Sequence, residues 1–394
     1  MAFYVRKPVK WMLKLFSIGI ICGLLFKAAQ IVNDDSKQFK FDVHGSDKLT
    51  TRNIFDSSQN RDVIRIVVVA CQGKSEHVIE ETVTMIKSAL IFTKRPIVFH
   101  VFTSDLSLKL RETFIKWPLS VRKKLLIRIH DVQYPLDPKD VDEMINWWGP
   151  CASFRLFLPT VLDSIDSVLY VDTDVTFLGA VDDLWEQFAN FDEIQVGGLA
   201  PRVGWDFQVP KSNPNFIELP NGHVTQVNSG VFLMNLTRMR RPVFRTDPKL
   251  SRSTFSWNKD YLLPLYRSHI EDMHGDQNLI NTVFHYNPKL LYFISCRFNY
   301  HHKFCIDTHA ERQCRAAERD GAAVVHGNAN TYQNNFAPVF RAIHQAMKEY
   351  HFERDSKKIL FHNMKNKLTD PKVEKAEHCG NKTDLFLKVF EQML

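Results

Sequence analysis

Short β-branched runs that alternate with helical patterns constrain the fold of this chain more than any other feature. The first run, residues 64–70, reads IRIVVVA, and similar apolar runs occupy residues 97–102, 125–129 and 167–171. Continuous Val- and Ile-rich runs are typical of strands that are buried on both faces. Apolar residues recur at helical spacing from Glu76 to Phe92, and a second helix is expected from Ala152 to Leu162. This order predicts an α/β fold in which helices cover a mostly parallel sheet.

Functional residues are expected just past the ends of these strands, because ligands of open α/β sheets bind at the carboxyl edge. The turn after the first strand, residues 71–74, reads CQGK, which differs from the G-x-G-x-x-G of a dinucleotide site. The fourth strand is followed at once by Asp172 and Asp174, with Thr173 between them. Both carboxylates can meet one divalent cation there, since such hard ions prefer oxygen ligands. Two aspartates in this position also fit ordinary caps or turns, so the pair alone does not decide the function.

A phosphatase is a rival interpretation of the same residues. The stretch 172–176, DTDVT, fits the D-x-D-x-T nucleophile motif of haloacid-dehalogenase-like phosphatases. These enzymes also need a later acidic motif for Mg²⁺, and the best candidate, Asp276, has no second acid beside it. Their nucleophile lies on an early strand, whereas several predicted strands precede Asp172. The phosphatase is therefore the weaker interpretation.

The charge of the chain favours an anionic ligand over nucleic acid. A net charge of +7 is mild for 394 residues. No run of Lys and Arg is interleaved with aromatic residues in the way that a nucleic-acid face requires, so nucleic acid is not an expected partner. A nucleotide diphosphate suits a mild excess of positive charge.

The cysteines favour disulfides in an oxidising compartment. Of seven cysteines, Cys22 lies in an apolar N-terminal run, which leaves six beyond it, an even number. No C-x-x-C pair occurs, which argues against zinc. Cys71 and Cys151 adjoin predicted elements and also fit buried thiols, so the connectivity stays open. The other four lie in a polar stretch or beyond it, at Cys296, Cys305, Cys314 and Cys379.

The N-terminus is expected to be a membrane anchor. Residues 1–10 carry positive charges and form the predicted cytosolic tail, and residues 11–32 form an apolar run broken only by Lys14 and Lys27. Lysine stems near the ends of a span can reach the headgroups, so the run is long enough to cross a bilayer. A cleaved signal peptide is the alternative, but Lys27 stands where a signal peptidase expects a small side chain. The positive flank predicts a cytosolic N-terminus and a luminal remainder.

The rest of the chain divides into a stem and one catalytic domain. Residues 33–61 are polar, with few large apolar groups, and form the predicted luminal stem. Residues 62–394 form the predicted domain. Of two N-glycosylation sequons, the one at Asn381 lies in a polar tail and is the expected glycan site, whereas Asn235 directly follows an apolar run.

Three motifs, taken in order, resemble glycosyltransferase family 8. They are residues 169–174 (LYVDTD), 227–235 (VNSGVFLMN) and 275–281 (GDQNLIN). Within that family the chain resembles the glucoside xylosyltransferases most, through residues 151–159, 181–185, 202–205, 234–241 and 326–328. The resemblance covers roughly residues 65–343 and implies a GT-A fold, the Rossmann-like fold of nucleotide-diphospho-sugar transferases, as a single catalytic domain.

The resemblance also implies a reaction. The cofactor would be Mn²⁺, the donor UDP-xylose, and the acceptor an O-linked glucose on epidermal-growth-factor-like (EGF) repeats, as in Notch receptors. The new bond would be an α1,3 linkage formed with retention, in the Golgi or the endoplasmic reticulum, by a single-pass type II membrane protein. Two alternatives remain: a family member that uses UDP-glucose or UDP-galactose, and a luminal sugar-binding protein without catalysis.

Site residues follow from the resemblance by motif position. Asp172, Asp174 and His326 match the metal ligands. Asp276, Gln277 and Arg155 match the catalytic groups near the sugar and the diphosphate, although Asp276 could also cap a helix and Arg155 form a surface ion pair. The remaining expected contacts of the donor and cofactor are Ala70, Cys71, Thr173, Asn228, Ser229, Gly327 and Asn328.

Three further places in the sequence carry open questions. Distant relatives continue the histidine motif with a lysine for the phosphates, but residues 327–330 read GNAN here, so another cation would have to substitute. Gly230 is expected simply because the backbone is approached closely there, without a chemical role. Trp205 could stack on the acceptor or be buried in its loop.

Overall fold

The computed structural model describes residues 62–71, 77–149, 151–202, 209–219, 222–248, 251–306 and 314–394. The predicted tail, anchor and stem lie outside the described residues, as does Trp205. Within the described ranges, no helix combines the length and apolar character that a membrane crossing requires.

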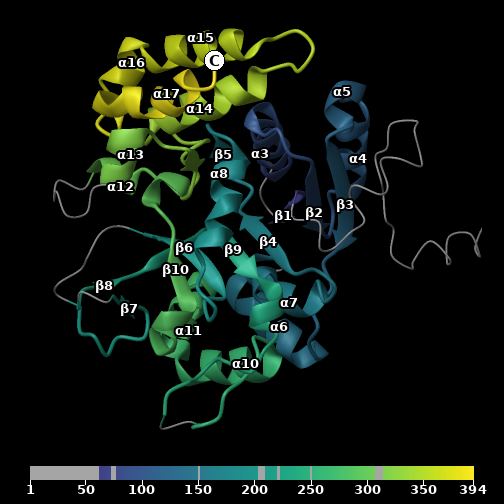
Figure 1. Ribbon diagram of the computed structural model, residues 1–394, viewed down its shortest axis with the longest axis vertical. Helices are drawn as coiled ribbons and strands as arrows, with labels where there is room; N and C mark the ends of the chain where they lie inside the picture. Colours follow the sequence, from purple (N-terminus) through teal and green to yellow (C-terminus); the bar gives the residue numbers. More distant parts are fainter. Residues whose placement is uncertain are drawn as a thin grey trace, which may run out of the picture. The chain divides into compact units, whose positions relative to one another are not determined.

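A seven-stranded mixed sheet forms the centre of the described residues (Figure 1). Its strands lie in the order β10-β6-β9-β4-β1-β2-β3. The four neighbours from β4 to β3 are parallel, as are β6 and β10, whereas β9 runs antiparallel to both β4 and β6. The strand bounds are β1 (Ile64–Val69), β2 (Ile97–Thr103), β3 (Leu125–Asp131), β4 (Ser167–Val171), β6 (Gly197–Pro201), β9 (Val227–Asn235) and β10 (Leu291–Phe293).

The four predicted strands are all present, because their apolar runs pack on both faces of the sheet. In β1, Ile66 and Val68 belong to one hydrophobic core, while Val67 packs into a second core on the opposite face. Each strand ends within two residues of its predicted end. The prediction of a mostly parallel sheet is confirmed, with β9 as the described strand that runs the other way.

Two small sheets flank the large one. Strand β5 (Val175–Phe177) pairs antiparallel with β11 (Val324–His326), so that His326 lies opposite Val175. This ladder carries a histidine that is distant in sequence to the carboxyl end of β4. The second small sheet joins β7 (Ile217–Glu218) to β8 (Val224–Thr225).

The two predicted helices are present with changed boundaries. Helix α3 (Val78–Phe92) follows β1, although residues 72–76 lie outside the described ranges. The expected helix from Ala152 is instead a 3-10 helix (Ala152–Phe157) that continues into α7 (Leu158–Val161). Pro159 has no N–H to donate to the carbonyl of Arg155, and that carbonyl accepts from Leu158 instead. A continuous α-helix is therefore disfavoured here.

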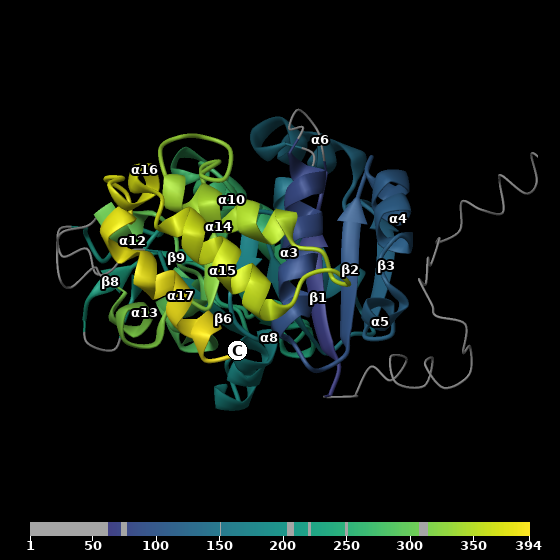
Figure 2. The ribbon, with the colours of Figure 1, turned by 90° about the horizontal axis from the view of Figure 1, so that it is seen from above.

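The remaining helices surround the sheets, and α14–α17 lie together beside α3 and α13 in both views (Figures 1 and 2). The α-helices are α4 (Ser107–Ile115), α5 (Leu119–Arg122), α6 (Pro138–Trp148), α8 (Val181–Trp185), α9 (Leu236–Met239), α10 (Lys259–Ser268), α11 (Asp276–Tyr286), α12 (Lys303–Ile306), α13 (Arg315–Asp320), α14 (Pro338–Glu349), α15 (Lys357–Leu368), α16 (Pro371–Glu374) and α17 (Thr383–Glu391). Single-turn 3-10 helices are Glu186–Asn190, Ile270–Asp272, Pro288–Leu290, Cys296–Phe298 and Gly380–Lys382.

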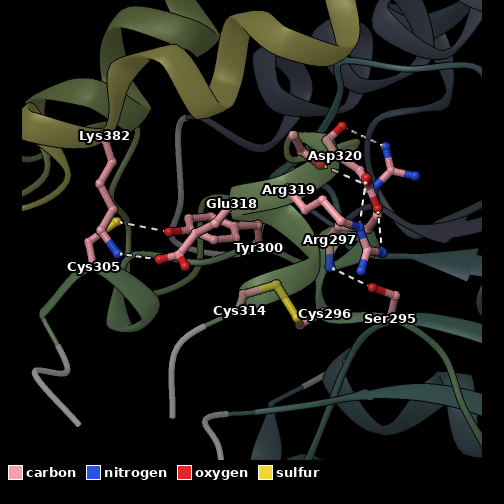
Figure 3. Close-up of a disulfide and its surroundings, with 11 residues drawn as sticks. Ser295, Cys296, Arg297, Tyr300, Cys305, Cys314, Glu318, Arg319, Asp320 and Lys382 are labelled. Atoms are coloured by element: carbon pink, nitrogen blue, oxygen red, sulfur yellow. Dashed lines mark hydrogen bonds and ion pairs between the residues drawn. A yellow bond between two sulfur atoms is a disulfide. The ribbon is translucent and has the colours of Figure 1, made fainter. Parts of the chain in front are cut away.

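All six cysteines beyond residue 61 form disulfides. Cys71 pairs with Cys151, so the interpretation of these two as buried thiols is wrong. The bond joins the end of β1 to the start of the 3-10 helix 152–157. The other pairs are Cys296–Cys314 and Cys305–Cys379, and the first of these is drawn in Figure 3. They hold the segment after β10 against α13 and the C-terminal helices.

Candidate active site

Asp172, Asp174 and His326 meet at the carboxyl end of β4. The His326 Nε2 atom lies 3.3 Å from Asp174 Oδ1 and 3.7 Å from Asp172 Oδ2. One donor atom from each residue falls within 4.8 Å of the other two, which is close enough for all three to hold one ion. The three predicted metal ligands are therefore brought together by β4 and by the β5–β11 ladder.

A hydrogen bond to Asn299, on the side of the ring away from the carboxylates, fixes the orientation of His326. Its Nδ1 atom is 2.9 Å from Asn299 Oδ1, so the ring carries its proton at Nδ1 and directs the Nε2 lone pair at the carboxylates. The Asn299 amide in turn donates to the side chain and carbonyl of Asn228, at 2.9 and 3.2 Å. The side-chain amides of Asn299 and Asn228 are thus hydrogen-bonded to each other, and that of Asn299 also to the His326 Nδ1 atom. The His326 Nε2 atom is left to bind a cation. The donor set of two carboxylates and one imidazole fits a divalent ion.

Gly230 is required by the crowding at this point. A Cβ atom there would lie 2.1 Å from His326 Cε1 and 2.8 Å from Asp172 Oδ2. The backbone of Gly230 also accepts a hydrogen bond from the Asp172 N–H at 2.9 Å. The groups that approach the Gly230 backbone are thus two metal ligands, His326 and Asp172. Their closeness explains why this position is a glycine.

Arg155 connects the acids of the β4 end to Asp276. Its Nε and Nη2 atoms both donate to the Asp276 carboxylate, the second at 2.9 Å, and Nη1 donates to Asp172 Oδ1 at 2.9 Å. The guanidinium is almost fully buried, as is Asp276. Burial opposes the charged form, but the two carboxylates outweigh it and hold the pKa of Arg155 above its usual value. Arg155 is therefore a buried clamp and not the surface ion pair weighed as an alternative.

Asp276 and Gln277 open helix α11 and both face this network. The N-cap of α11 is Gly275, and Asp276 is its first residue, so its carboxylate serves Arg155 and does not cap the helix. Gln277 Oε1 accepts from the backbone N–H of Ser229 at 3.1 Å and from its hydroxyl at 3.3 Å. Gln277, in the motif 275–281, is thus hydrogen-bonded to Ser229, in the motif 227–235.

The other expected contact residues lie around the same edge. Ala70 is buried directly after β1, where its N–H donates to Phe102 O, and Cys71 is held by its disulfide. The Thr173 hydroxyl donates to Glu81 at 3.3 Å. The Gly327 N–H donates to Asp174 O at 2.7 Å, and the half-buried Asn328 follows it.

The electrostatics of the cluster suit cation binding. Burial opposes protonation of His326, but Asp174 and Asp172 outweigh it and raise the His326 pKa. Burial also opposes ionisation of Asp174, yet His326 beside it lowers the Asp174 pKa. Behind the cluster, burial and then the charge of Asp174 raise the pKa of Glu81 to about 7. The carboxylates at the β4 end thus create a negative field in which a bound cation would be stabilised.

Sequence reasoning missed three residues of this network. Tyr170 donates to Asp172 Oδ1 at 2.6 Å, and its ring centroid lies 5.1 Å from the Arg155 guanidinium carbon. Asn299 orients His326, and Glu81 contacts Thr173. Tyr170 sits in a strand where an aromatic residue fits simple core packing, so nothing in the pattern distinguishes it. Asn299 and Glu81 lie outside the quoted motifs and become visible only in three dimensions.

The fold defines the class of protein. A galactosyltransferase solved in complex with donor and acceptor sugar analogues overlays with a TM-score of 0.51 at 19% identity, covering 75% of this chain and 98% of that one. That likeness shows a GT-A-like glycosyltransferase fold. The chain belongs to glycosyl transferase family 8, whose model matches residues 54–331, more than half of its length. It is a glycosyltransferase, and the phosphatase interpretation is wrong.

Curated relatives place the chain near one group of this family. It is 36% identical over 337 residues to glucoside xylosyltransferase 2 of Mus musculus, covering 84% of this chain and 71% of the relative. It is 35% identical over 334 residues to glucoside xylosyltransferase 1 of Homo sapiens, covering 82% and 70%. The predicted family resemblance is confirmed, and a nucleotide-sugar donor and a divalent-cation site accord with it.

Proposed function

We propose that this protein transfers xylose from UDP-xylose, in α1,3 linkage and with retention, onto O-linked glucose of EGF-like repeats such as those of Notch receptors. The observation that carries the donor and acceptor is the 34–36% identity to several proteins named glucoside xylosyltransferase over more than four fifths of this chain. The catalytic groups support it, because Asp172, Asp174 and His326 converge as a metal site requires. Loss of that convergence would instead favour a sugar-binding protein without catalysis.

Mn²⁺ is the proposed cofactor, held by Asp172, Asp174 and His326. It accepts mixed oxygen and imidazole ligands. When bound, such an ion supplies Lewis-acid stabilisation of the negative charge on a departing diphosphate. The chain's own contribution is to hold the three donors in place through Asn299, Tyr170 and Arg155.

Retention is proposed to follow a same-face route. A double displacement needs a nucleophile, and Gln277 is an amide, which is a poor one. Asp276 is a stronger base, but Arg155 occupies both of its oxygens. In the same-face route the leaving phosphate oxygen accepts the proton of the acceptor hydroxyl, while the protein positions both substrates. Gln277→Ala tests the assigned place of Gln277: an unchanged turnover number would show that the amide does not lie beside the reacting carbon.

The proposed location is the lumen of the Golgi or the endoplasmic reticulum, with residues 11–32 as the anchor. The six disulfide-bonded cysteines support an oxidising compartment. The exposed Asn381 supports a glycan at the second sequon, whereas the Asn235 side chain caps α9 by accepting from the Arg238 N–H. Carbonate extraction and glycosidase digestion of the expressed full chain test these assignments.

A donor panel tests the proposed reaction. The purified chain is incubated with UDP-xylose, UDP-glucose or UDP-galactose and a glucose-bearing EGF repeat, with Mn²⁺ or with chelator, and the product is weighed. We expect a pentose increment, from UDP-xylose only and with metal only. A hexose increment would assign another family 8 donor, and UDP binding without release or transfer in any reaction would leave a sugar-binding protein.

A further inference from the structure

The charges at the β4 end leave a diphosphate without a counter-charge. Asp172 and Asp276 form ion pairs with Arg155, and a third carboxylate, Asp174, lies near enough to feel its charge. These carboxylates and the guanidinium together leave a net negative charge that one divalent cation would neutralise. No positive charge would then remain for a diphosphate. Arg155 itself has Nε and both Nη atoms engaged by Asp276, Asp172 and the Ser229 carbonyl. Since both phosphates of a nucleotide sugar are ionised, other donors must meet them.

His301 is placed to be one of these donors. A parallel bridge pairs Tyr300 with Val325, and the His326 N–H donates to the Tyr300 carbonyl at 2.9 Å. Because side chains alternate along extended chains, His301 lies on the same side of this bridge as His326, opposite the core residues Tyr300 and Val325. The imidazole of His301 is thus the neighbour of a metal ligand.

The His301 ring is fully buried and lacks the partners that a buried polar group normally has. Neither ring nitrogen makes a hydrogen bond of ordinary geometry within the described residues, although the Arg202 carbonyl lies close enough to favour the protonated form. An imidazole ring carries at least one N–H, which can donate a hydrogen bond to an anion. A buried ring whose nitrogens are met only by this one carbonyl, in poor geometry, leaves room for a ligand to accept a better hydrogen bond.

Two residues with cationic side chains, Arg202 and Lys303, lie next to His301. Arg202 follows β6, and its guanidinium Nη1 donates to Gln226 Oε1 at 2.9 Å. Gln226 directly precedes the β9 strand that carries Asn228 and Ser229. Lys303 opens α12, two residues after His301. Burial, and then the charge of Arg202, lower the Lys303 pKa. Among the described residues neither cation has an acidic partner within ion-pair distance, and the two positive charges lie close enough to repel each other.

Disulfides hold this segment in place. Cys296 and Cys305 bracket residues 297–304, and they bond to Cys314 and Cys379. Between them, the Tyr300 hydroxyl lies 3.3 Å from Cys305 Sγ, and Arg297 donates to the carbonyls of Gly321 and Asp320 (Figure 3). The backbone that carries His301 and Lys303 is therefore held in place before any ligand binds, which lowers the entropy cost of binding.

We propose that Arg202, His301 and Lys303 form an anion pocket beside the metal ligands that binds the diphosphate of the donor nucleotide, in place of the lysine that residues 327–330 lack. The proposal rests on the proposed function insofar as the ligand is a nucleoside diphosphate. His301 donates its ring N–H to a phosphate oxygen, and Arg202 and Lys303 supply the positive charge. No bond is made or broken by these three residues, which bind and orient.

Nucleotide titration with Mn²⁺ tests the pocket, using the full-length chain in detergent with UDP, UMP and uridine as probes. We expect Arg202→Gln, Lys303→Gln and His301→Leu each to weaken UDP binding about tenfold and uridine binding less than about twofold. His301→Gln, which keeps a donor, should lose less than His301→Leu. Lys259→Gln removes an exposed charge elsewhere and should bind UDP as the unmodified chain does.

Two results would overturn the pocket: UDP affinity that survives all three substitutions, or UDP and uridine affinities that fall together, which marks a structural role. Lys303 is partly exposed, so its variant is informative even where the His301 variants fail to fold. GDP and CDP are titrated alongside. If the unmodified chain prefers one of them, the proposed UDP donor fails, and the pocket is judged on that nucleotide against its nucleoside. If no nucleoside diphosphate binds, both proposals fail.

Discussion

The two sides of the metal cluster are built in different ways. On the acidic side, Asp172 and Asp174 follow β4, a strand with parallel and antiparallel neighbours deep in the large sheet. On the histidine side, His326 ends the three-residue strand β11, and Asn299 behind it lies in a segment held by disulfides. The comparison teaches that the large sheet fixes one half of the site, whereas a short ladder, supported by disulfides in the neighbouring segment, fixes the other half.

The acidic side should show the largest effect of a single substitution. Asp174→Asn keeps the size of the side chain and removes the charge that a cation needs, so we expect transfer to fall on the order of 10³-fold. Initial rates over a range of Mn²⁺ concentrations measure it. Asp163→Asn, at an exposed carboxylate outside the cluster, is the matched control. A loss below about tenfold would mean that Asp174 is not a ligand.

A substitution at Gly230 tests the contact between the acidic side and the histidine side, because Gly230 lies against both Asp172 and His326. In Gly230→Ala, the added methyl group would displace both His326 and Asp172, and we expect transfer to fall about 10²-fold with weaker Mn²⁺ binding. The control is Gly179→Ala, where a Cβ would meet Val389 Cγ1 at 2.9 Å, a crowded position away from the cluster. It should lower the melting temperature without changing the Mn²⁺ dependence. Equal Mn²⁺ dependence in both variants would contradict this account.

The support behind His326 should matter less than the ligands. Asn299→Ala removes the acceptor that orients the imidazole, so we expect about tenfold weaker Mn²⁺ affinity with little change in rate at saturating metal. Asn363→Ala, which removes an exposed amide bound to Glu349, is the control. If Asn299→Ala lowered the rate at saturating metal and left the affinity intact, the orienting role would be wrong.

The disulfides of the histidine side are compared with each other. Cys305–Cys379 spans 74 residues and Cys296–Cys314 spans 18. Because a longer closed loop restricts the unfolded chain more, replacing the first pair by serine should cost about 1 kcal/mol more stability than replacing the second. Denaturant unfolding measures both. Equal losses would mean that native contacts, and not the unfolded chain, set the effect.

A pH effect is expected from Glu81, behind the acidic side. Its folded pKa of about 7 lies above the ordinary 4.5, so the folded chain binds this proton more tightly than the unfolded chain. Stability from this group is therefore present at low pH and is lost as pH rises through 7. In chelator, Glu81→Gln should melt with a smaller pH dependence between pH 5 and 8. An unchanged dependence would contradict the raised pKa.

The sequence predicts the acidic side better than the histidine side. Continuous apolar runs predict buried strands, and Asp172 and Asp174 directly follow such a run. His326 was found only through a family resemblance, because a short strand and one imidazole carry no local pattern. Asn299 and His301 were missed, since amides and histidines in a polar stretch are ordinary there. Their position depends on pairing with β11 and on disulfides, both long-range contacts that local spacing does not encode.

The bond between Cys71 and Cys151 has a consequence for making this enzyme. It ties the strand end where the nucleotide base is expected to the turn that leads, four positions on, to Arg155. In a reducing cytosol the sheet could still assemble, yet the segment that carries Arg155 would then be held by non-covalent contacts alone. If the protein folds in the oxidising compartment proposed for it, this bond forms there, and preparations from reducing hosts should contain folded but less active protein.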